Sequence, residues 1–253
     1  MKHKNIVLCE LLPWDTKFFH CRIARVYTDT LNEEQALQIA DWSRSHGVEC
    51  LYFLARADDP ATIQAAEENG FGLVDIRVTF DWVPGKSPPL APAAASASLR
   101  IRTAQVADLP CLQAMSRTGH TDTRFFKDSH FPRQRAEDLY ATWITKDVEG
   151  RADIVLVAAS EADEPLGYIT GHLDHACRQG QIGLVGVSSQ ARRRGIGKSL
   201  VLAAMDWFRA QGVPMVTVVT QGDNRAAQRL YQQCGFLTQD LQLWYHKWYP
   251  VSS

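Results

Sequence analysis

A basic turn that contains glycine, between an apolar strand and an amphipathic helix, is the stretch best suited to chemistry. Its residues are Val185, Gly186, Val187, Arg192, Arg193, Arg194, Gly195, Ile196, Gly197 and Lys198. A strand that leads through a turn into a helix leaves the first helical amides unpaired, and these amides and the helix dipole attract an anion. The glycines let the backbone approach a bulky anion, and the guanidinium groups suit a pyrophosphate or a ribose phosphate. The turn therefore predicts a phosphate-binding site.

The helix that follows supplies two more chemical groups. Asn224 opens it, and Tyr231 lies seven residues on, about two turns away and on nearly the same face. Asn224 offers a polar contact or only a helix cap, and Tyr231 offers a weak acid or a packed aromatic ring. Glycine patterns also serve plain turns and charge runs are usually solvated, so the phosphate interpretation depends on this second pair.

The first half of the chain predicts a small domain. A capping-box spacing predicts a helix over 32–47, and Asp59-Pro60 opens a second helix that ends near Gly70. A buried strand is predicted over 48–55. A strand with one face buried is predicted over 74–81, with Val74, Ile76, Val78 and Phe80 inward, and 12–19 is interpreted as a loop over the core.

The second half predicts a longer alternation of strands and helices. The expected elements are strand 99–102, helix 108–117, a helix around 136–144, strands 154–158, 166–170 and 181–187, helix 196–212, strand 215–219, helix 224–233 and a closing strand through 241–245. The Pro/Ala/Ser-rich stretch 84–98 can neither form a ladder nor pack a core, so it predicts a linker between domains 1–83 and 99–253. Both halves contain a helix ended by Gly-Phe and followed by a strand, so the first is interpreted as a reduced copy of the second, without the anion site.

Composition excludes several classes of protein. A net charge of -1 argues against a nucleic-acid-binding protein, and no apolar run is long enough to cross a bilayer. The N-terminus does not read as a signal peptide, so we expect a cytoplasmic location without membrane insertion. The six cysteines form no C-x-x-C pair, and His172-Leu173-Asp174-His175 has no third ligand nearby. We therefore expect buried free thiols and no metal.

Two motifs resemble the GNAT superfamily of N-acetyltransferases. Arg192-Arg193-Arg194-Gly195-Ile196-Gly197 matches the family hallmark Gln/Arg-x-x-Gly-x-Gly/Ala, and Asn224, Ala227, Leu230, Tyr231, Gly235 and Phe236 match the later Asn-x-x-Ala-x-x-Leu-Tyr-x-x-x-Gly-Phe. The resemblance implies an α/β (α+β) fold with a mixed, mostly antiparallel sheet flanked by helices. It also implies acetyl-CoA as donor, with its pyrophosphate on the amides of 193–198, its pantetheine along 185–187, a further contact from Asn224, and Tyr231 as general acid.

The whole chain is also similar to GNAT enzymes that act on nucleotide-linked 4-amino-4,6-dideoxyhexoses. The residues that carry this similarity are Trp14-Asp15-x-x-Phe18-Phe19, Gly70-Phe71-x-Leu73-Val74-Asp75, Arg124-Phe125 and Tyr140-Ala141-x-Trp143-Ile144. It implies an amino-sugar nucleotide as acceptor, with dTDP expected. Trp14, Phe18, Phe19, Arg124 and Phe125 would contact the acceptor, to whose site the first half contributes, and Asp75 would act as base.

Several alternatives stay open. Asp75 is equally interpreted as a solvent-facing strand residue, and the cations Arg124, Lys127, Arg133 and Arg135 either bind the nucleotide diphosphate or are solvated surface charge. The acceptor could be another amine, such as a protein N-terminus, a polyamine or an antibiotic, or the chain could be a non-catalytic acyl-CoA sensor. A homodimer is compatible with each of these functions.

Overall fold

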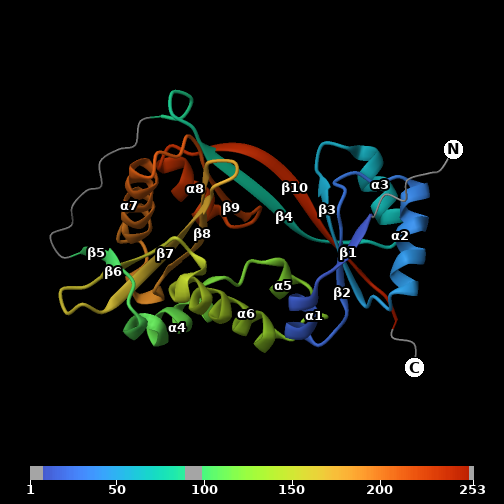
Figure 1. The fold of residues 1–253 in the computed structure, drawn as a ribbon, viewed down its shortest axis with the longest axis horizontal. Coiled ribbons are helices and arrows are strands. Elements are labelled where there is room, and N and C mark those ends of the chain that lie inside the picture. The colour runs from blue at the N-terminus through green and yellow to red at the C-terminus, as the bar shows by residue number, and fades with distance from the viewer. Residues whose placement is uncertain (1–7, 89–98, 251–253) are drawn as a thin grey trace. The chain divides into compact units, whose positions relative to one another are not determined.

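The computed structural model describes residues 8–88 and 99–250 (Figure 1). The strands are β1 (Cys9–Leu11), β2 (Ile23–Val26), β3 (Cys50–Arg56), β4 (Gly72–Trp82), β5 (Arg100–Thr103), β6 (Ile154–Ala159), β7 (Pro165–Asp174), β8 (Gln179–Val187), β9 (Val216–Gln221) and β10 (Leu237–Trp248). The helices are α1 (Pro13–Phe19), α2 (Glu33–Ser45), α3 (Pro60–Glu68), α4 (Leu109–Gly119), α5 (Arg124–Lys127), α6 (Arg133–Lys146), α7 (Ile196–Ala210) and α8 (Arg225–Gln233).

These strands form one ten-stranded sheet in the order β1-β2-β3-β10-β4-β9-β8-β7-β6-β5. The pairs β2–β3 and β8–β9 are parallel, whereas β1–β2, β3–β10, β5–β6, β6–β7 and β7–β8 are antiparallel. The predicted fold class, a mixed and mostly antiparallel sheet flanked by helices, is confirmed.

The chain divides into two compact units, neither of which is continuous in sequence. Unit 1 comprises Met1–Arg77, Lys127–Phe131 and Leu241–Ser253, and unit 2 comprises Val78–Phe126 and Pro132–Asp240. Unit 1 thus includes two segments from the half that was predicted as a separate domain. Most of the predicted linker 84–98 lies outside the described residues.

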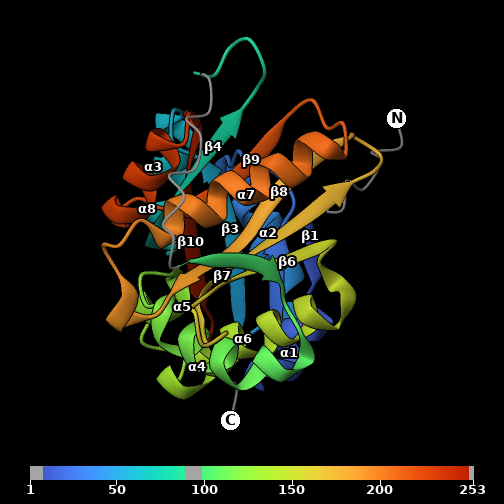
Figure 2. The same cartoon turned by 90° about the vertical axis from the view of Figure 1, so that its left-hand side faces the viewer.

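Unit 2 has a core on each face of its part of the sheet. Ile169 of β7 packs with Leu200 and Phe208 of α7, whereas its neighbour Tyr168 packs with Leu112 of α4 and other residues of the opposite face. Successive side chains of a strand point to opposite faces, so α7 covers one face and α4 the other (Figure 2). Each buried side chain of this size contributes about 1.5–3 kcal/mol to the folded state.

Unit 1 packs helices α2 and α3 on one face of β3. Ala36 and Ile39 of α2 and Ala66 of α3 form a cluster with Leu51 and Phe53 of β3. Asn32 caps α2 as the capping-box spacing predicts, with its side-chain oxygen accepting from the amide of Gln35 at 2.9 Å.

The helix ending at Gly-Phe that was predicted for both halves is present in both. Gly70 and Gly235 have φ angles of 77° and 79°, which glycine adopts without the Cβ penalty. The amide of Phe71 donates to the carbonyl of Ala66 at 3.0 Å, and that of Phe236 donates to the carbonyl of Tyr231 at 3.0 Å. The same cap therefore ends α3 before β4 and α8 before β10.

Two local predictions are wrong. Residues 13–19 form helix α1 rather than a loop; Pro13 starts it with a preset φ, although Leu12 provides no side-chain cap. In β4 the expected alternation breaks, because Asp75 is buried and Ile76 is 40% exposed. The Asp75 carboxylate tolerates burial because Lys127 pairs with it.

The free cysteines only partly match expectation. Cys9, Cys50 and Cys234 are buried, whereas Cys111 and Cys177 are exposed. Two free thiols on the surface are therefore open to oxidation.

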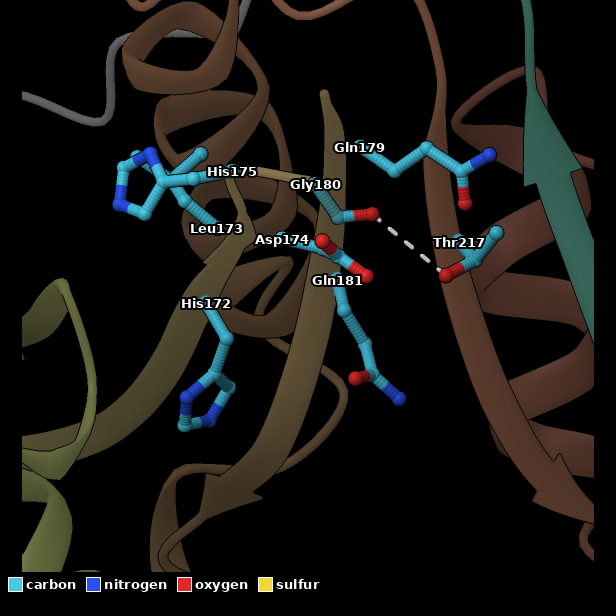
Figure 3. A pocket seen from close by; sticks show the side chains of 8 residues that line it. All are labelled: His172, Leu173, Asp174, His175, Gln179, Gly180, Gln181 and Thr217. Carbon is cyan, nitrogen blue, oxygen red and sulfur yellow. Dashed lines mark hydrogen bonds between the residues drawn. The ribbon is translucent and has the colours of Figure 1, made fainter. Parts of the chain in front are cut away.

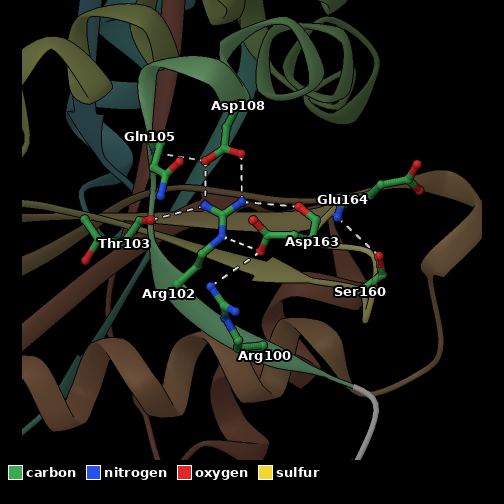
Figure 4. A network of polar contacts seen from close by, with 8 residues as sticks. All are labelled: Arg100, Arg102, Thr103, Gln105, Asp108, Ser160, Asp163 and Glu164. Carbon is green, nitrogen blue, oxygen red and sulfur yellow. Dashed lines mark hydrogen bonds and ion pairs between the residues drawn. The ribbon is translucent and has the colours of Figure 1, made fainter.

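A partly buried arginine of β5 links three segments of unit 2 (Figure 4). The guanidinium of Arg102 donates to both carboxylate oxygens of Asp108, at 2.7 and 2.9 Å, and its Nε donates to Asp163 at 2.8 Å. The hydrogen bonds from Arg102 hold the pKa of Asp108 below its usual value. Strand β5 is thereby fixed to the start of α4 and to the turn between β6 and β7.

Candidate active site

Strand β8 contains a β-bulge near its C-terminal end. The antiparallel register with β7 shifts between the pairs Ile169–Val185 and Gly171–Ile182, so β8 has one more residue than β7 over this interval. A single extra residue reverses the edge toward which each following backbone group points.

The amides after the bulge show which edge each residue faces. The amide of Leu184 donates to the Thr170 hydroxyl at 2.8 Å, and the amide of Ser188 donates to a carbonyl of β7 at 2.9 Å. Amides of successive residues point to opposite edges of a strand, so the N–H and C=O groups of Val185 and Val187 point away from β7, toward the side of β9.

The parallel ladder between β8 and β9 ends before these groups. It joins Gly180–Ile182 to Val216–Val218, while β8 continues to Val187 and β9 to Gln221. The edge of β8 over 183–187 therefore presents backbone donors and acceptors beyond the ladder. An extended chain that carries amides, such as pantetheine, can bind this edge in the way that a strand does.

The turn after β8 leads into the N-terminus of α7, where an anion could bind. Gly195 is the N-cap with a φ of 78°, and Arg193 also takes a left-handed φ of 61°. The amides of Ile196–Lys198 belong to the first helical turn and have no acceptor within the helix. Arg192 is exposed, with its Nε 3.5 Å from the carbonyl of Val187. Aligned amides, the helix dipole and exposed cations could together hold a phosphate group here.

Gly197 brings together the turn, the end of β8 and helix α8. A Cβ at this position would lie 3.2 Å from Leu230 Cδ2 and 3.8 Å from Val187 Cγ2. The first turn of α7 therefore packs tightly against the residue that precedes Tyr231. The two glycines differ in purpose: Gly195 provides the left-handed backbone, and Gly197 allows close packing.

Tyr231 lies inside the core of unit 2. It is 4% exposed, and its ring centroid is 6.0 Å from those of Phe80 and Phe236. Burial raises the pKa of its hydroxyl, so the group is protonated at neutral pH. The side chain is both a packed aromatic ring and a proton-bearing hydroxyl.

Asn224 serves as the N-cap of α8. Its side-chain oxygen accepts from the amide of Ala227 at 3.0 Å. The cap fixes the start of the helix that carries Tyr231.

The four residues of unit 1 predicted for the acceptor site or as base each make a close contact within that unit. The carboxylate of Asp75 accepts from Lys127 Nζ at 2.7 Å. The rings of Trp14 and Phe18 stack with centroids 5.0 Å apart and an interplanar angle of 13°. Phe19 is buried and packs on Phe131, with centroids 4.6 Å apart. Unit 1 thus places an acidic residue and aromatic rings in one compact part of the chain.

The predicted pair Arg124 and Phe125 belongs to unit 2. Phe125 is buried, and the guanidinium carbon of Arg124 lies 4.2 Å from its ring centroid. This contact is a cation–π interaction, which orients the guanidinium.

A buried carboxylate in unit 1, that of Asp128, accepts several hydrogen bonds and was not identified from the sequence. Asp128 is 7% exposed and accepts from His246 Nδ1 at 2.6 Å, Trp248 Nε1 at 2.9 Å, and both the amide and the ring of His130 at 3.0 and 2.8 Å. Desolvation acts to raise the pKa of Asp128, but these hydrogen bonds outweigh it and hold the pKa well below its usual range. The spacing of residues in the sequence could not indicate this cluster, because two of the groups that donate to Asp128 lie 118 and 120 residues away.

A cavity of about 460 Å³ lies at the other end of β8 (Figure 3). Its lining includes His172, His175, Gln181 and Thr217, and Gln181 pairs with Thr217 in the β8–β9 ladder. It is therefore separate from the β8 edge at Val187. Over 8–88 and 99–250, His, Cys, Asp and Glu side chains form no group of three that could hold a metal ion. In the same ranges no helix is long and apolar enough to cross a membrane.

A strand edge beyond its ladder lies next to a helix N-terminus, and the adjacent helix carries a protonated tyrosine. Together these groups could bind an acyl-CoA donor and protonate its thiolate leaving group. Residues 119–236 match the acetyltransferase (GNAT) family, which uses an acyl-CoA donor. Residues 119–236 therefore belong to the GNAT superfamily of N-acetyltransferases.

Relatives in sequence and structure extend over both units. The dTDP-fucosamine acetyltransferase of Escherichia coli O6:H1 is 27% identical over 244 residues, which cover 94% of this chain and 97% of that protein. The spore coat polysaccharide biosynthesis protein SpsD of Bacillus subtilis is 28% identical over 142 residues, or 56% of this chain and 48% of its own length. A tandem GNAT protein from the clavulanic acid biosynthesis pathway shares the fold, with a TM-score of 0.63 and 17% identity over 91% of this chain and 76% of that structure.

Proposed function

We propose that the protein transfers the acetyl group of acetyl-CoA to the 4-amino group of a dTDP-linked 4-amino-4,6-dideoxyhexose. The observation that carries this proposal is the similarity to dTDP-fucosamine acetyltransferase, because it spans nearly the full length of both proteins. Similarity confined to the GNAT part would support only the donor. Unit 1 is the part expected to distinguish one acceptor from another.

We propose that unit 2 binds the acetyl-CoA donor. We place the CoA pyrophosphate on the amides of 193–198 and the pantetheine along 185–187. Arg192, Arg193 and Arg194 are exposed at the rim of this turn, where they can pair with phosphate oxygens. The outward-facing N–H of Val187 is the proposed donor to the thioester oxygen, which becomes an oxyanion during the reaction.

The proposed chemistry is direct attack. The sugar amine forms a bond to the acetyl carbonyl carbon, the tetrahedral intermediate collapses, and the C–S bond breaks. The departing thiolate takes the proton of Tyr231, and the proton lost by the amine passes to Asp75 through water. Tyr231 is suited to this step because burial keeps its hydroxyl protonated. Asp75, whose carboxylate accepts from Lys127 Nζ at 2.7 Å, is the proposed acceptor of this proton.

A panel of amines with acetyl-CoA tests the proposal. It contains dTDP-4-amino-4,6-dideoxygalactose, a peptide with a free N-terminus, spermidine and an aminoglycoside, with release of the CoA thiol as readout. We expect turnover with the nucleotide sugar alone. Turnover of another amine would assign a different acceptor, and CoA binding without any turnover would indicate an acyl-CoA sensor.

A further inference from the structure

A chain of buried hydrogen bonds in unit 2 ends at a histidine that the sequence did not single out. The Ser116 hydroxyl donates to the carbonyl of Tyr140 at 3.0 Å, and the Tyr168 hydroxyl donates to Ser116 Oγ at 3.0 Å. His120 Nε2 lies 2.9 Å from the Tyr168 oxygen. Ser116 and Tyr168 are both 0% exposed, so each must satisfy its polar atoms inside the protein.

The direction of these bonds fixes the tautomer of the histidine. A hydroxyl has a single proton to donate, and Ser116 uses its proton on the carbonyl of Tyr140. Tyr168 therefore gives its own proton to Ser116, and its oxygen is left as an acceptor. His120 must then donate from Nε2–H, which leaves the lone pair of the neutral ring on Nδ1.

The surroundings keep this ring neutral. Desolvation lowers the pKa of His120 to about 4, and the ring stacks on Tyr140 with centroids 4.7 Å apart and an interplanar angle of 17°. The residue is partly exposed, although its Nε2 faces the buried hydroxyl. At neutral pH, Nδ1 is thus a hydrogen-bond acceptor. The stack on Tyr140 and the hydrogen bond of Nε2 fix the orientation of its ring.

This chain of hydrogen bonds lies next to the β8 edge of the proposed donor site. Gly186 sits on the ring of Tyr168, and a Cβ on Gly186 would come within 2.4 Å of Tyr168 Cε1. Tyr168 and Gly186 are partners in the β7–β8 ladder, so they share one face of the sheet. Helix α7 covers the other face and α4 covers the face of Tyr168, but His120 is the C-cap of α4 and is partly exposed, so an acceptor can reach its ring at this end of the helix.

We propose that His120 Nδ1 accepts a hydrogen bond from the acceptor amine and turns the nitrogen lone pair toward the thioester carbonyl. This inference rests on the proposed acetyltransferase function and adds a residue that contacts the reacting amine. His120 orients the amine and does not take its proton, because a weakly basic imidazole is a poor proton acceptor for an amine.

The tautomer is tested without any substrate, by heteronuclear NMR of the imidazole nitrogens in the free protein at pH 7. We expect Nε2 protonated and Nδ1 unprotonated. In Ser116→Ala, Tyr168 loses its acceptor and donates to Nε2, so the proton moves to Nδ1. Thr118→Ala is the matched control, because this exposed hydroxyl two residues along α4 bonds only to carbonyls of its own helix. A wild-type ring protonated on Nδ1 would overturn the inference.

Kinetics test the role of His120 in the reaction. For His120→Ala and Ser116→Ala we expect kcat/KM for the amine to fall about five- to tenfold or more, the effect of one lost hydrogen bond, with unchanged Kd for CoA. His175→Ala, an exposed histidine of the same unit, is the control. If the wild type acetylates an amine and both variants do so equally well, the inference fails while the proposed function stands. If the wild type acetylates no amine, the proposed function itself fails, and the inference with it.

Discussion

Gly195→Glu places a carboxylate at the point where the CoA pyrophosphate is proposed to bind. Gly195 is the N-cap of α7, and a Cβ at this position has no heavy atom within 4 Å. The new side chain therefore meets open space, and two effects remain. One is the strain of a left-handed φ of 78°, and the other is the negative charge at the helix N-terminus.

The two effects act on different quantities. A non-glycine residue at a left-handed φ costs about 1–2 kcal/mol of folding free energy, and Gly195→Ala incurs the same cost. Two like charges 4 Å apart repel by about 1 kcal/mol in bulk water and by about 4 kcal/mol at an effective dielectric of 20. For a site at the surface we expect a loss of about 2–3 kcal/mol in CoA binding, which is a rise in Kd of about 30- to 150-fold.

Isothermal titration calorimetry with CoA separates charge from strain. Gly195→Ala should bind CoA within a few-fold of wild type, and the effect of Gly195→Glu should shrink as salt is added. Gly212→Glu is a matched control, because Gly212 ends the same helix with a φ of 68° and equally open space. Equal CoA affinity in Gly195→Glu and Gly195→Ala would show that this turn does not hold the pyrophosphate.

Three further substitutions test the rest of the site. Tyr231→Phe should lower kcat about 10²- to 10⁴-fold with unchanged CoA affinity, because the ring still packs while the proton donor is lost; unchanged kcat in a thiol-release assay would remove Tyr231 from the mechanism. Asp75→Asn should lower kcat/KM for the amine about 10²-fold or more in the same assay, with Asp81→Asn on the same strand as control, and normal activity would exclude Asp75 as base. Asp128→Asn should cost about 2–4 kcal/mol of stability by urea denaturation at pH 7, because buried donors lose a charged acceptor. The Asp128 pKa is lower in the folded state than in the unfolded state, so its stabilisation is full above about pH 4 and declines as the pH falls further. The variant should lack this part of the acid dependence, and an identical acid limb in both proteins would contradict the assigned role.

The sequence predicted the elements of the proposed donor site, the turn after β8 and helix α8, because their signals are local. The turn at 192–198 and the helix that carries Tyr231 are short segments whose caps and spacings depend on neighbouring residues. The helix-Gly-Phe cap is equally local, and it occurs at Gly70 and Gly235 as predicted.

The features that were missed depend on contacts between distant segments. Asp128 gains its partners His246 and Trp248 only when β10 pairs with β3 in unit 1. The tautomer of His120 depends on Tyr168, 48 residues away. Helix α1 was missed for a different reason, since its first turn has no side-chain cap to announce it.

Transfer of an isotope-labelled acetyl group from acetyl-CoA to dTDP-4-amino-4,6-dideoxygalactose tests the central claim most directly. NMR of the product locates the label. We expect a new amide at the sugar 4-nitrogen, formed at a rate that Tyr231→Phe reduces by orders of magnitude. A protein that binds CoA at the α7 turn yet leaves this amine unmodified, or acetylates a different amine in its place, would contradict the claim.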